Sequence, residues 1–329
     1  MHFSLENRQG VLDKSEQKSK PYIGRYAPSP SGRLHYGNLR TALLSWIHAR
    51  LNNGKWLLRF DDIDSPRVVA GSDQQIMEDL DWLGLDWDGQ PYYQSEQLPF
   101  YQQKLDELID DHGCYECFCS RKDIQQAASA PHGKMAVYPG KCRHLSQSEK
   151  QDKAAQKHPA IRLQVENKTI SFEDGILGSQ TQNMATECGD FVIKRADGLF
   201  AYQFTVVLDD IAQGVTDVVR GSDLLDSSPR QLYLFERFGA NFPTFWHVPL
   251  VMTEKNQRMA KRDGSSSVVD WQMQGGSAET LIAKFANELG LLAKADGIDS
   301  ISPQQLLEQI DLELLIKQLL TKQLRPQSV

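Results

Sequence analysis

No stretch of this chain is apolar for long enough to cross a bilayer, which argues against a membrane-spanning helix. The first residues also lack the charged and then apolar pattern of a secretory signal. Only five cysteines occur among 329 residues, which excludes a disulfide framework of the kind found in small secreted domains. We therefore expect a cytoplasmic protein without a membrane partner.

The chain also has no excess of positive charge. Its net charge of −7 argues against indiscriminate binding to nucleic acid. A local basic face stays possible, because the distribution of charge steers a partner more than its sum does. A hydrophobic content of 40% and a charged content of 24% are typical of a globular protein of two or three structural units. We expect the polar residues 1–20 to form a flexible tail.

Strand-like and helix-like segments alternate in the first third of the chain. Strands are predicted at 22–27 and 55–60, and the apolar spacing and boundary residues predict helices at 38–52, 72–83 and 97–111. Alternation of this kind predicts an α/β fold with a Rossmann-type parallel sheet. The ligand of such a sheet lies at the carboxyl ends of the strands.

A cysteine-bearing segment interrupts this alternation. We predict a catalytic domain in two halves, 21–112 and 190–255, split by an insertion at 113–189 and followed by a helical segment at 256–329. Short strands are expected in the insertion at 160–165 and 169–172. For the remainder we expect strands at 191–194, 214–220 and 245–253, and helices at 203–211, 229–238, 278–292 and 303–320.

The loop between the first strand and the first helix is rich in proline and glycine and runs from Ala27 to Asn38. It is a candidate phosphate site, because backbone N–H groups and the positive end of the helix dipole would face an anion there. Gly37 would let a nucleotide approach closely, and His35 and Asn38 add side-chain donors. An ordinary connection between a strand and a helix is the alternative.

Four of the five cysteines lie between positions 114 and 142, and such crowding suggests a metal site. Cys117, Cys119 and Cys142 supply three thiolates, whereas zinc prefers four tetrahedral ligands. Coordination chemistry alone favours Cys114 or His144 as the fourth ligand. Free buried thiols are the alternative to a metal site.

Four blocks of sequence together resemble the class I aminoacyl-tRNA synthetases in their glutamate-specific form. His35 to Asn38, after Ala-Pro-Ser-Pro-Ser-Gly, is similar to the HIGH signature of that class. Arg258-Met-Ala-Lys-Arg262 resembles the KMSKS loop, and the blocks 190–203 and 219–231 resemble segments of the glutamyl enzymes. The four blocks occur in the right order over residues 25–262, and they imply the class I catalytic fold.

The resemblance implies that ATP binds at the HIGH-like loop and that an amino acid is converted to its adenylate. His35, Gly37, Asn38 and Lys261 would bind ATP and act in catalysis, with Lys261 on a loop that closes during activation. Magnesium would arrive with ATP, so no dedicated protein site for Mg²⁺ is expected. Ala260 stands in place of the family's serine, which leaves no serine hydroxyl to act at that position.

A glutamate substrate carries two carboxylates, and the planar guanidinium of arginine binds a carboxylate better than a lysine does. By resemblance, Arg25 and Arg220 converge on glutamate from the ends of two strands. Asp61 would bind its ammonium group, and Tyr202 would complete the pocket. The loop residues that the resemblance adds to this pocket are Tyr26, Ala27, Pro28 and Ser29. Asp61 stands where the family more often has glutamate, and a solvated acidic turn is the alternative there.

For the metal, the resemblance points to a different fourth ligand. The glutamyl-type enzymes use Cys-x-Cys followed by Tyr-x-x-x-Cys, and Tyr138-Pro-Gly-Lys-Cys142 fits that spacing. We therefore expect Cys117, Cys119, Tyr138 and Cys142 to hold one structural Zn²⁺, with Cys114 as the alternative to Tyr138. A phenol has a free pKa of about 10, which zinc would have to lower. The zinc would stabilise an insertion that is otherwise poorly packed.

Two departures from the full-length glutamyl enzymes indicate a short paralog. The chain ends 67 residues after Arg262, which leaves no room for an anticodon-binding domain, and Gly221-Ser-Asp-Leu224 stands where those enzymes have Gly-Asp-Asp-His. Such paralogs attach glutamate to queuosine, the modified base in the anticodon of tRNA(Asp). The implied partners of a monomeric enzyme are ATP, L-glutamate and this tRNA. Conventional charging of a tRNA 3′ end, another nucleotidyltransferase activity and a non-catalytic zinc- and RNA-binding paralog are the alternatives.

Overall fold

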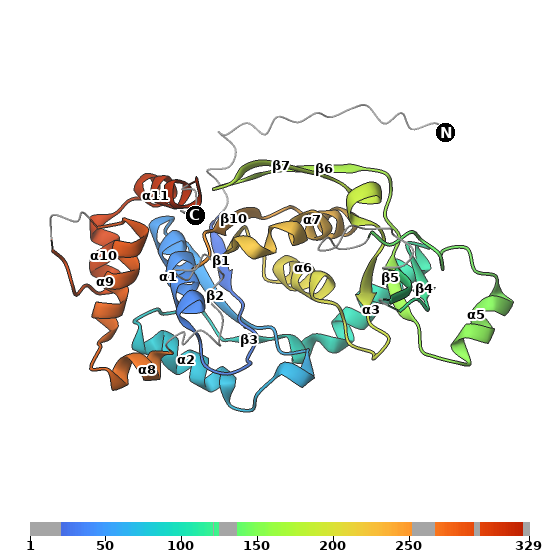
Figure 1. The fold of residues 1–329 in the computed structure, drawn as a ribbon, viewed down its shortest axis with the longest axis horizontal. Helices are drawn as coiled ribbons and strands as arrows, with labels where there is room; N and C mark the ends of the chain where they lie inside the picture. Colours follow the sequence, from blue (N-terminus) through green and yellow to red (C-terminus); the bar gives the residue numbers. More distant parts are fainter. Residues whose placement is uncertain (1–20, 121, 125–136, 252–266, 293–296, 325–329) are drawn as a thin grey trace.

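Two β-sheets form the frame of the protein (Figure 1). The computed structural model describes residues 21–120, 122–124, 137–251, 267–292 and 297–324. Within these ranges the large sheet has the strand order β3-β2-β1-β9-β10-β6-β7, and the small sheet has the order β4-β5-β8. The strands are β1 (Ile23–Tyr26), β2 (Lys55–Phe60), β3 (Tyr92–Tyr93), β4 (Cys114–Cys117), β5 (Ala160–Leu163), β6 (Thr169–Asp174), β7 (Gly178–Asn183), β8 (Phe191–Lys194), β9 (Asp217–Gly221) and β10 (Thr244–Val248).

The helices connect and cover these strands. They are α1 (Tyr36–Leu51), α2 (Ser72–Trp82), α3 (Leu98–Asp110), α5 (Gln147–Ala154), α6 (Tyr202–Ala212), α7 (Ser228–Arg237), α8 (Val268–Met273), α9 (Ala278–Leu289), α10 (Pro303–Gln309) and α11 (Leu312–Leu324). The helices α5, α8, α9 and α10 each begin at a serine that caps the first turn reciprocally with the residue three positions on. Short helical turns are η2 (Ser65–Arg67), η3 (Gln94–Gln97), η4 (Met184–Cys188) and η5 (Ser222–Ser227).

The first strand–helix–strand unit follows the predicted Rossmann-type pattern. The extended backbone of His35 precedes the first turn of α1, and the helix ends at Asn52. Asn53 then adopts a left-handed conformation with φ of 51° before β2 begins. β2 returns parallel to β1, so α1 forms the crossover connection between the two strands. The predicted α/β class is confirmed.

The strand order creates a switch point between β1 and β9. β1 is parallel to β2 on one side and to β9 on the other, and β9 is parallel to β10. From β1 the chain proceeds outward through β2 to β3, whereas β9 and β10 lie on the opposite side. Ligands of such sheets bind beyond the carboxyl ends of the strands at this point. The loop after β1 therefore occupies the position of a ligand-binding loop.

β8 belongs to a different sheet from the one predicted, and β6 together with β7, a strand that was not predicted, joins the large sheet. β6 and β7 form a hairpin at the edge of the large sheet, with β6 parallel to β10, although both lie within the predicted insertion. β8, which was predicted to resume the large sheet, pairs antiparallel with β5 in the small sheet. This prediction is wrong because alternation within a short strand shows that one face is buried but not which sheet the strand joins. The domain boundaries themselves stay a prediction.

The segment 303–320 forms two helices rather than the single one predicted. Ile310 has an extended backbone, with φ of −128° and ψ of 154°, and separates α10 from α11. Asp311 Oδ1 then accepts a hydrogen bond from the backbone N–H of Leu314 over 2.7 Å. This side chain satisfies a free N–H group at the start of α11, as an N-terminal cap does.

Helices cover both faces of the large sheet. On one face Tyr26, Leu58 and Val219 pack beneath α1 in a core that continues into the C-terminal helices. On the other face Val218 and Phe245 pack against α6 and α7. Figure 1 shows the C-terminal helices at one end of the molecule and the small sheet with α5 at the other. No helix in the described part of the chain is long and apolar enough to cross a membrane.

Candidate active site and metal centre

Three arginines lie on one face of the large sheet around the switch point. Arg25 of β1 is level with Leu57 of β2, and Gly24 is level with Asp217 of β9. Side chains two residues apart on a strand share a face. Arg59 of β2 and Arg220 of β9 therefore project on the same face as Arg25, nearer the carboxyl ends of their strands. The sheet thus brings three guanidinium groups together beneath α6.

Two of these arginines share one carboxylate. Asp210 of α6 accepts hydrogen bonds from Arg25 Nε over 3.1 Å and from Arg59 Nη1 over 2.7 Å. Arg25 and Arg59 are 5% and 0% exposed, so neither charge can be solvated by bulk water. Burial alone would raise the pKa of Asp210, but the two arginines offset it and hold that pKa below its usual value. Asp210 is therefore the counter-ion that lets two buried arginines stay charged.

Asp61 continues this network at the end of β2. Its Oδ1 accepts a hydrogen bond from Arg59 Nε over 2.9 Å, and its side chain is 9% exposed. Burial raises the pKa of Asp61 to about 6, and the neighbouring Arg59 acts in the opposite direction. Asp61 thus lies in a buried charge network next to Arg59, which does not fit the alternative of a solvated acidic turn.

Arg220 has a different environment from the other two arginines. It donates to His247 Nε2 over 3.0 Å, to Gln231 Oε1 over 2.7 Å and to Ser228 Oγ over 2.8 Å. Its guanidinium also lies over the ring of Phe245, 4.5 Å from the centroid. Burial lowers the pKa of Arg220 to about 10, and the nearby positive charge of Arg25 acts in the same direction, whereas Tyr202 opposes the shift. A buried cation whose hydrogen-bond partners are neutral is suited to binding an anion.

Tyr202 marks the open side of this arrangement. It is the first residue of α6 and is 37% exposed, and its hydroxyl interacts with Arg220. Arg25, Arg220, Asp61 and Tyr202, which the resemblance assigned to glutamate, therefore lie around one switch point. An arrangement of this type offers guanidinium groups to a carboxylate and a carboxylate to an ammonium group.

The remaining loop residues lie at different depths. Tyr26 points to the opposite face from Arg25, is buried against Trp56, and donates to the carbonyl of Asn38 over 3.3 Å. Its side chain therefore packs in the core, and only its main chain faces the switch point. The Pro28 carbonyl accepts from the N–H of Asp61 over 3.1 Å, which ties the loop to the end of β2. Pro28 is buried, Ala27 is half-buried and Ser29 is exposed.

The start of α1 is accessible where the phosphate site was predicted. Asn38 is exposed, while His35 and Gly37 are half-buried. A Cβ atom added to Gly37 would find only Val251, with the nearest atom at 3.6 Å, which is an ordinary contact. The packing of the described residues therefore does not itself require a glycine at position 37. Lys261 and its neighbours 258–262 lie outside the described residues.

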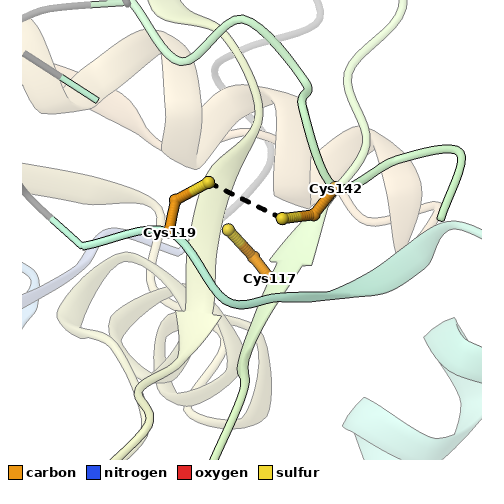
Figure 2. A group of neighbouring side chains, drawn as sticks. All are labelled: Cys117, Cys119 and Cys142. Atoms are coloured by element: carbon orange, nitrogen blue, oxygen red, sulfur yellow. Dashed lines mark hydrogen bonds between the residues drawn. The ribbon is translucent and has the colours of Figure 1, made fainter. Parts of the chain in front are cut away.

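The three predicted cysteine ligands converge at the end of β4. Cys117 ends that strand, Cys119 follows it, and Cys142 comes from a later turn; their sulfur atoms all lie within 4.8 Å of one another. Figure 2 shows the sulfur atoms turned toward a common centre, with 3.6 Å between those of Cys119 and Cys142. Three thiolates at these separations are suited to binding a metal ion and are consistent with zinc.

The phenol of Tyr138 joins this group. Its oxygen lies 3.3 Å from the sulfur of Cys117 and 3.6 Å from that of Cys119. Gly189, with φ of 68°, lies against the backbone of Tyr138, and a Cβ there would come within 3.0 Å of its nitrogen. Burial raises the pKa of the Tyr138 phenol well above its usual range, so a metal would have to favour the phenolate. The guanidinium of Arg162 lies over the ring of Tyr138, 4.0 Å from its centroid.

The two alternative fourth ligands lie elsewhere. Cys114 is three residues before Cys117 on β4, packs against the hydrophobic core beneath α6 and α7, and is not part of the cysteine group. His144 is exposed and is likewise absent from that group among the described residues. The donor set of the structure is therefore three thiols and one phenol.

Several residues of the site escaped the sequence analysis. These are the buried polar groups behind the arginines: Arg59, Asp174, Asp209, Asp210 and His247. Two adjacent acids within an apolar helix, and a histidine within an apolar strand, were signals that could have found them, because buried polar groups need partners. Asp209 accepts from the hydroxyl of Tyr101 over 2.7 Å and fixes the end of α6 beside Asp210.

The comparisons with known proteins agree with this geometry. The model of the catalytic domain of class I tRNA synthetases (E and Q) matches residues 23–323. The fold and the match define a class I aminoacyl-tRNA synthetase catalytic domain, and thus a ligase. More narrowly, the chain belongs to the glutamyl-Q tRNA(Asp) synthetase family.

Two relatives show the extent of the similarity. The glutamyl-Q tRNA(Asp) synthetase of Nocardia farcinica is 46% identical over 82% of this chain and 85% of its own length. That of Symbiobacterium thermophilum is 42% identical over 88% of this chain and 92% of its own length.

Solved structures give the same fold. A glutamate tRNA ligase from Elizabethkingia meningosepticum, solved in complex with its amino acid, is 27% identical and has a TM-score of 0.75. The match covers 89% of this chain and 65% of that protein. This chain therefore spans slightly less than two thirds of the length of that ligase.

Proposed function

We propose that this enzyme activates L-glutamate with ATP and transfers the glutamyl group to queuosine in the anticodon of tRNA(Asp). The observation that carries the proposal is the switch point, where Arg25 of β1, Arg220 of β9 and Asp61, the residue directly after β2, lie at neighbouring strands of one sheet. Glutamate has two carboxylates and one ammonium group, and two arginines and an aspartate complement these three charges.

In the first step the α-carboxylate oxygen of glutamate attacks the α-phosphorus of ATP, and pyrophosphate leaves. Such a displacement gains most from positioning and from positive charge near the phosphoryl oxygens. We assign ATP to the start of α1, where the half-buried His35 and exposed Asn38 add donors to the helix N-terminus. Gly37 is half-buried and carries no side chain, which supports a close approach of the nucleotide to the backbone. Mg²⁺ would be bound with ATP.

Lys261 is assigned to the phosphates of ATP in this proposal. The described residues on either side of its segment support the assignment. Val251 is the last described residue before this segment, and it packs next to Gly37. Ser267 is the first described residue after the segment, and it pairs with the backbone of His35 in an antiparallel bridge. Both flanks of the KMSKS-like segment therefore lie at the loop that we assign to ATP.

In the second step a hydroxyl group of queuosine attacks the activated carbonyl, forming an ester as AMP leaves. The names of the relatives support this acceptor, because they are glutamyl-Q tRNA(Asp) synthetases. We further propose that Cys117, Cys119, Tyr138 and Cys142 hold one structural Zn²⁺. The convergence of their side chains supports this assignment.

The acceptor can be tested with four forms of tRNA(Asp). They combine the presence or absence of queuosine with the presence or absence of the 3′-terminal adenosine. We expect incorporation of radiolabelled glutamate to need queuosine and to survive removal of the adenosine. Incorporation that needs the adenosine but not queuosine would contradict the proposal and indicate conventional charging of the 3′ end.

A further inference from the structure

The partners of Arg220 differ in kind from those of Arg25. Arg25 pairs with the carboxylate of Asp210, which partly neutralises its charge. Arg220 instead donates to a ring nitrogen, an amide oxygen and a hydroxyl, on His247, Gln231 and Ser228, and forms no ion pair with the described residues. These neutral acceptors fix the orientation of the guanidinium and leave its charge available. An internal carboxylate in the same place would compete with a ligand for the fork.

The hydrogen bonds of Asp174 determine which nitrogen of His247 carries the proton. Asp174 Oδ1 accepts from the backbone N–H groups of Ile176 and Leu177 over 3.0 and 2.9 Å. Its Oδ2 lies 2.5 Å from His247 Nδ1. An ionised carboxylate can only accept, so Nδ1 must be the donor. In a neutral imidazole Nε2 then has a free lone pair, and the Nε–H of Arg220 points to it over 3.0 Å.

We propose that His247, with Asp174 behind it, is a positioning residue that orients Arg220 toward a carboxylate of glutamate. This inference rests on the proposed function, because it needs glutamate to be the ligand of Arg220. The hydrogen bonds from Arg220 to His247 and from His247 to Asp174 form a relay across three neighbouring strands. Asp174 ends β6, His247 is on β10, and Arg220 is level with His247 on β9. Asp174 and His247 hold the guanidinium but do not touch the substrate.

Asp174, His247 and Ser228 could be taken for a hydrolytic triad, because Ser228 Oγ lies 3.4 Å from His247 Nε2. Two observations argue against that activity. The Nε2 lone pair accepts from Arg220 at the shorter distance of 3.0 Å, so it is not available as a base for the serine. Ser228 is also 0% exposed, so its hydroxyl cannot reach a substrate. His247 therefore accepts a hydrogen bond from Arg220 and does not act as a base for Ser228.

Two substitutions at His247 separate a positioning role from a merely structural one. His247→Leu removes the acceptor, whereas His247→Gln retains an oxygen that can accept from Arg220. We expect His247→Leu to raise the KM for glutamate about tenfold or more in ATP–pyrophosphate exchange, with little change in the KM for ATP. His247→Gln should recover most of this loss. Equal KM values for glutamate in wild type and His247→Leu would overturn the proposal.

A matched control is His48→Gln, which changes another buried histidine on α1. His48 is 3% exposed and contacts Tyr22 and Trp246, away from the arginines. This variant should alter stability without raising the KM for glutamate. A rise as large as that of His247→Leu would mean that any buried histidine has the effect, and would overturn the inference.

A spectroscopic measurement on the wild-type protein needs neither a variant nor activity. With ¹⁵N-labelled histidine, long-range ¹H–¹⁵N correlation spectra should show His247 as the neutral Nδ1–H tautomer, identified by the loss of its signals in His247→Gln. An Nε2–H tautomer or an imidazolium would overturn the inference. If wild type gives no glutamate-dependent exchange, the proposed function is wrong. The tautomer of His247 is measured independently of activity, so it still tests whether His247 accepts a hydrogen bond from Arg220.

Discussion

Arg59 and Asp210 form a buried ion pair in which Arg59 Nη1 lies 2.7 Å from Asp210 Oδ1. The same carboxylate accepts a hydrogen bond from Arg25, so one acid on α6 balances arginines on β1 and β2. Asp210 therefore connects the helix that covers the site to the two strands that form it. Breaking a buried pair is costly because it leaves an uncompensated charge.

Replacing Asp210 by Asn should lower the free energy of unfolding by about 3 kcal/mol or more. The amide is similar in size but leaves Arg25 and Arg59 without their shared counter-ion. Chemical denaturation of the two proteins measures the difference. Asp197→Asn is the control, because Asp197 pairs with Arg195 at the surface, where both side chains are nearly half exposed. Its cost should stay below about 1 kcal/mol, and similar costs for the two variants would contradict this account.

Glutamate binding should depend on the protonation of Asp61. Because its pKa is raised to about 6, its carboxyl group is neutral below that pH and cannot pair with an ammonium group. The KM for glutamate should therefore rise by up to about tenfold for each pH unit below 6 and level off above it. Exchange kinetics between pH 5 and 8 test this, and Asp61→Asn should flatten the profile. A constant KM in wild type over this range would remove Asp61 from the ammonium site.

The metal centre should distinguish Tyr138 from Cys114. Wild type should contain about one zinc per chain after purification without added metal. Cys119→Ser should lose the metal, and Tyr138→Phe should weaken its retention against a chelator, because each removes one of four converging donors. Cys114→Ser is the matched control and should retain zinc as wild type does. Metal loss in Cys114→Ser but not in Tyr138→Phe would show that the fourth ligand is misassigned.

Stability at mildly acid pH should depend on His48. Burial lowers the pKa of His48 from 6.5 to about 4. The unfolded chain therefore binds a proton that the folded protein does not, and stability falls as the pH drops from 6.5 to about 4. His48 accounts for about 3 kcal/mol of this loss. Relative to His48→Gln, wild type should lose this amount in denaturation experiments at a series of pH values.

The control for His48 is His158→Gln, because His158 is exposed. Its stability should follow that of wild type at every pH. If His48→Gln also follows wild type throughout, the pKa of His48 does not differ between the folded and unfolded states, and the assignment is wrong.

The residue types and spacing of local motifs explain which parts of this protein could be predicted. The crowding of Cys117, Cys119 and Cys142 predicted a group of three thiols, and the family resemblance added Tyr138; the fold brings all four together. The alternation of strands and helices predicted the parallel sheet and placed Arg25 beside the loop after β1. Both signals lie within short stretches of chain, where residue type and period are sufficient.

Long-range pairing could not be predicted in the same way. The four residues Phe191–Lys194 alternate between buried and less buried, but nothing in them specifies β5 rather than the large sheet as the partner. Asp174 and His247 are 73 positions apart and meet only because β6 lies beside β10. Each is a buried polar residue whose partner depends on the strand order, which the local pattern does not contain.

The central claim is that two arginines at the switch point select glutamate for activation. It is tested most directly by ATP–pyrophosphate exchange without tRNA, in which the purified enzyme is given glutamate, glutamine or aspartate in turn. Of these three amino acids, we predict that only glutamate supports exchange. In Arg220→Lys the KM for glutamate should rise about tenfold or more, because lysine lacks the bidentate fork, whereas the KM for ATP should change little. Equal exchange with glutamine, or an unchanged KM for glutamate in Arg220→Lys, would contradict the account.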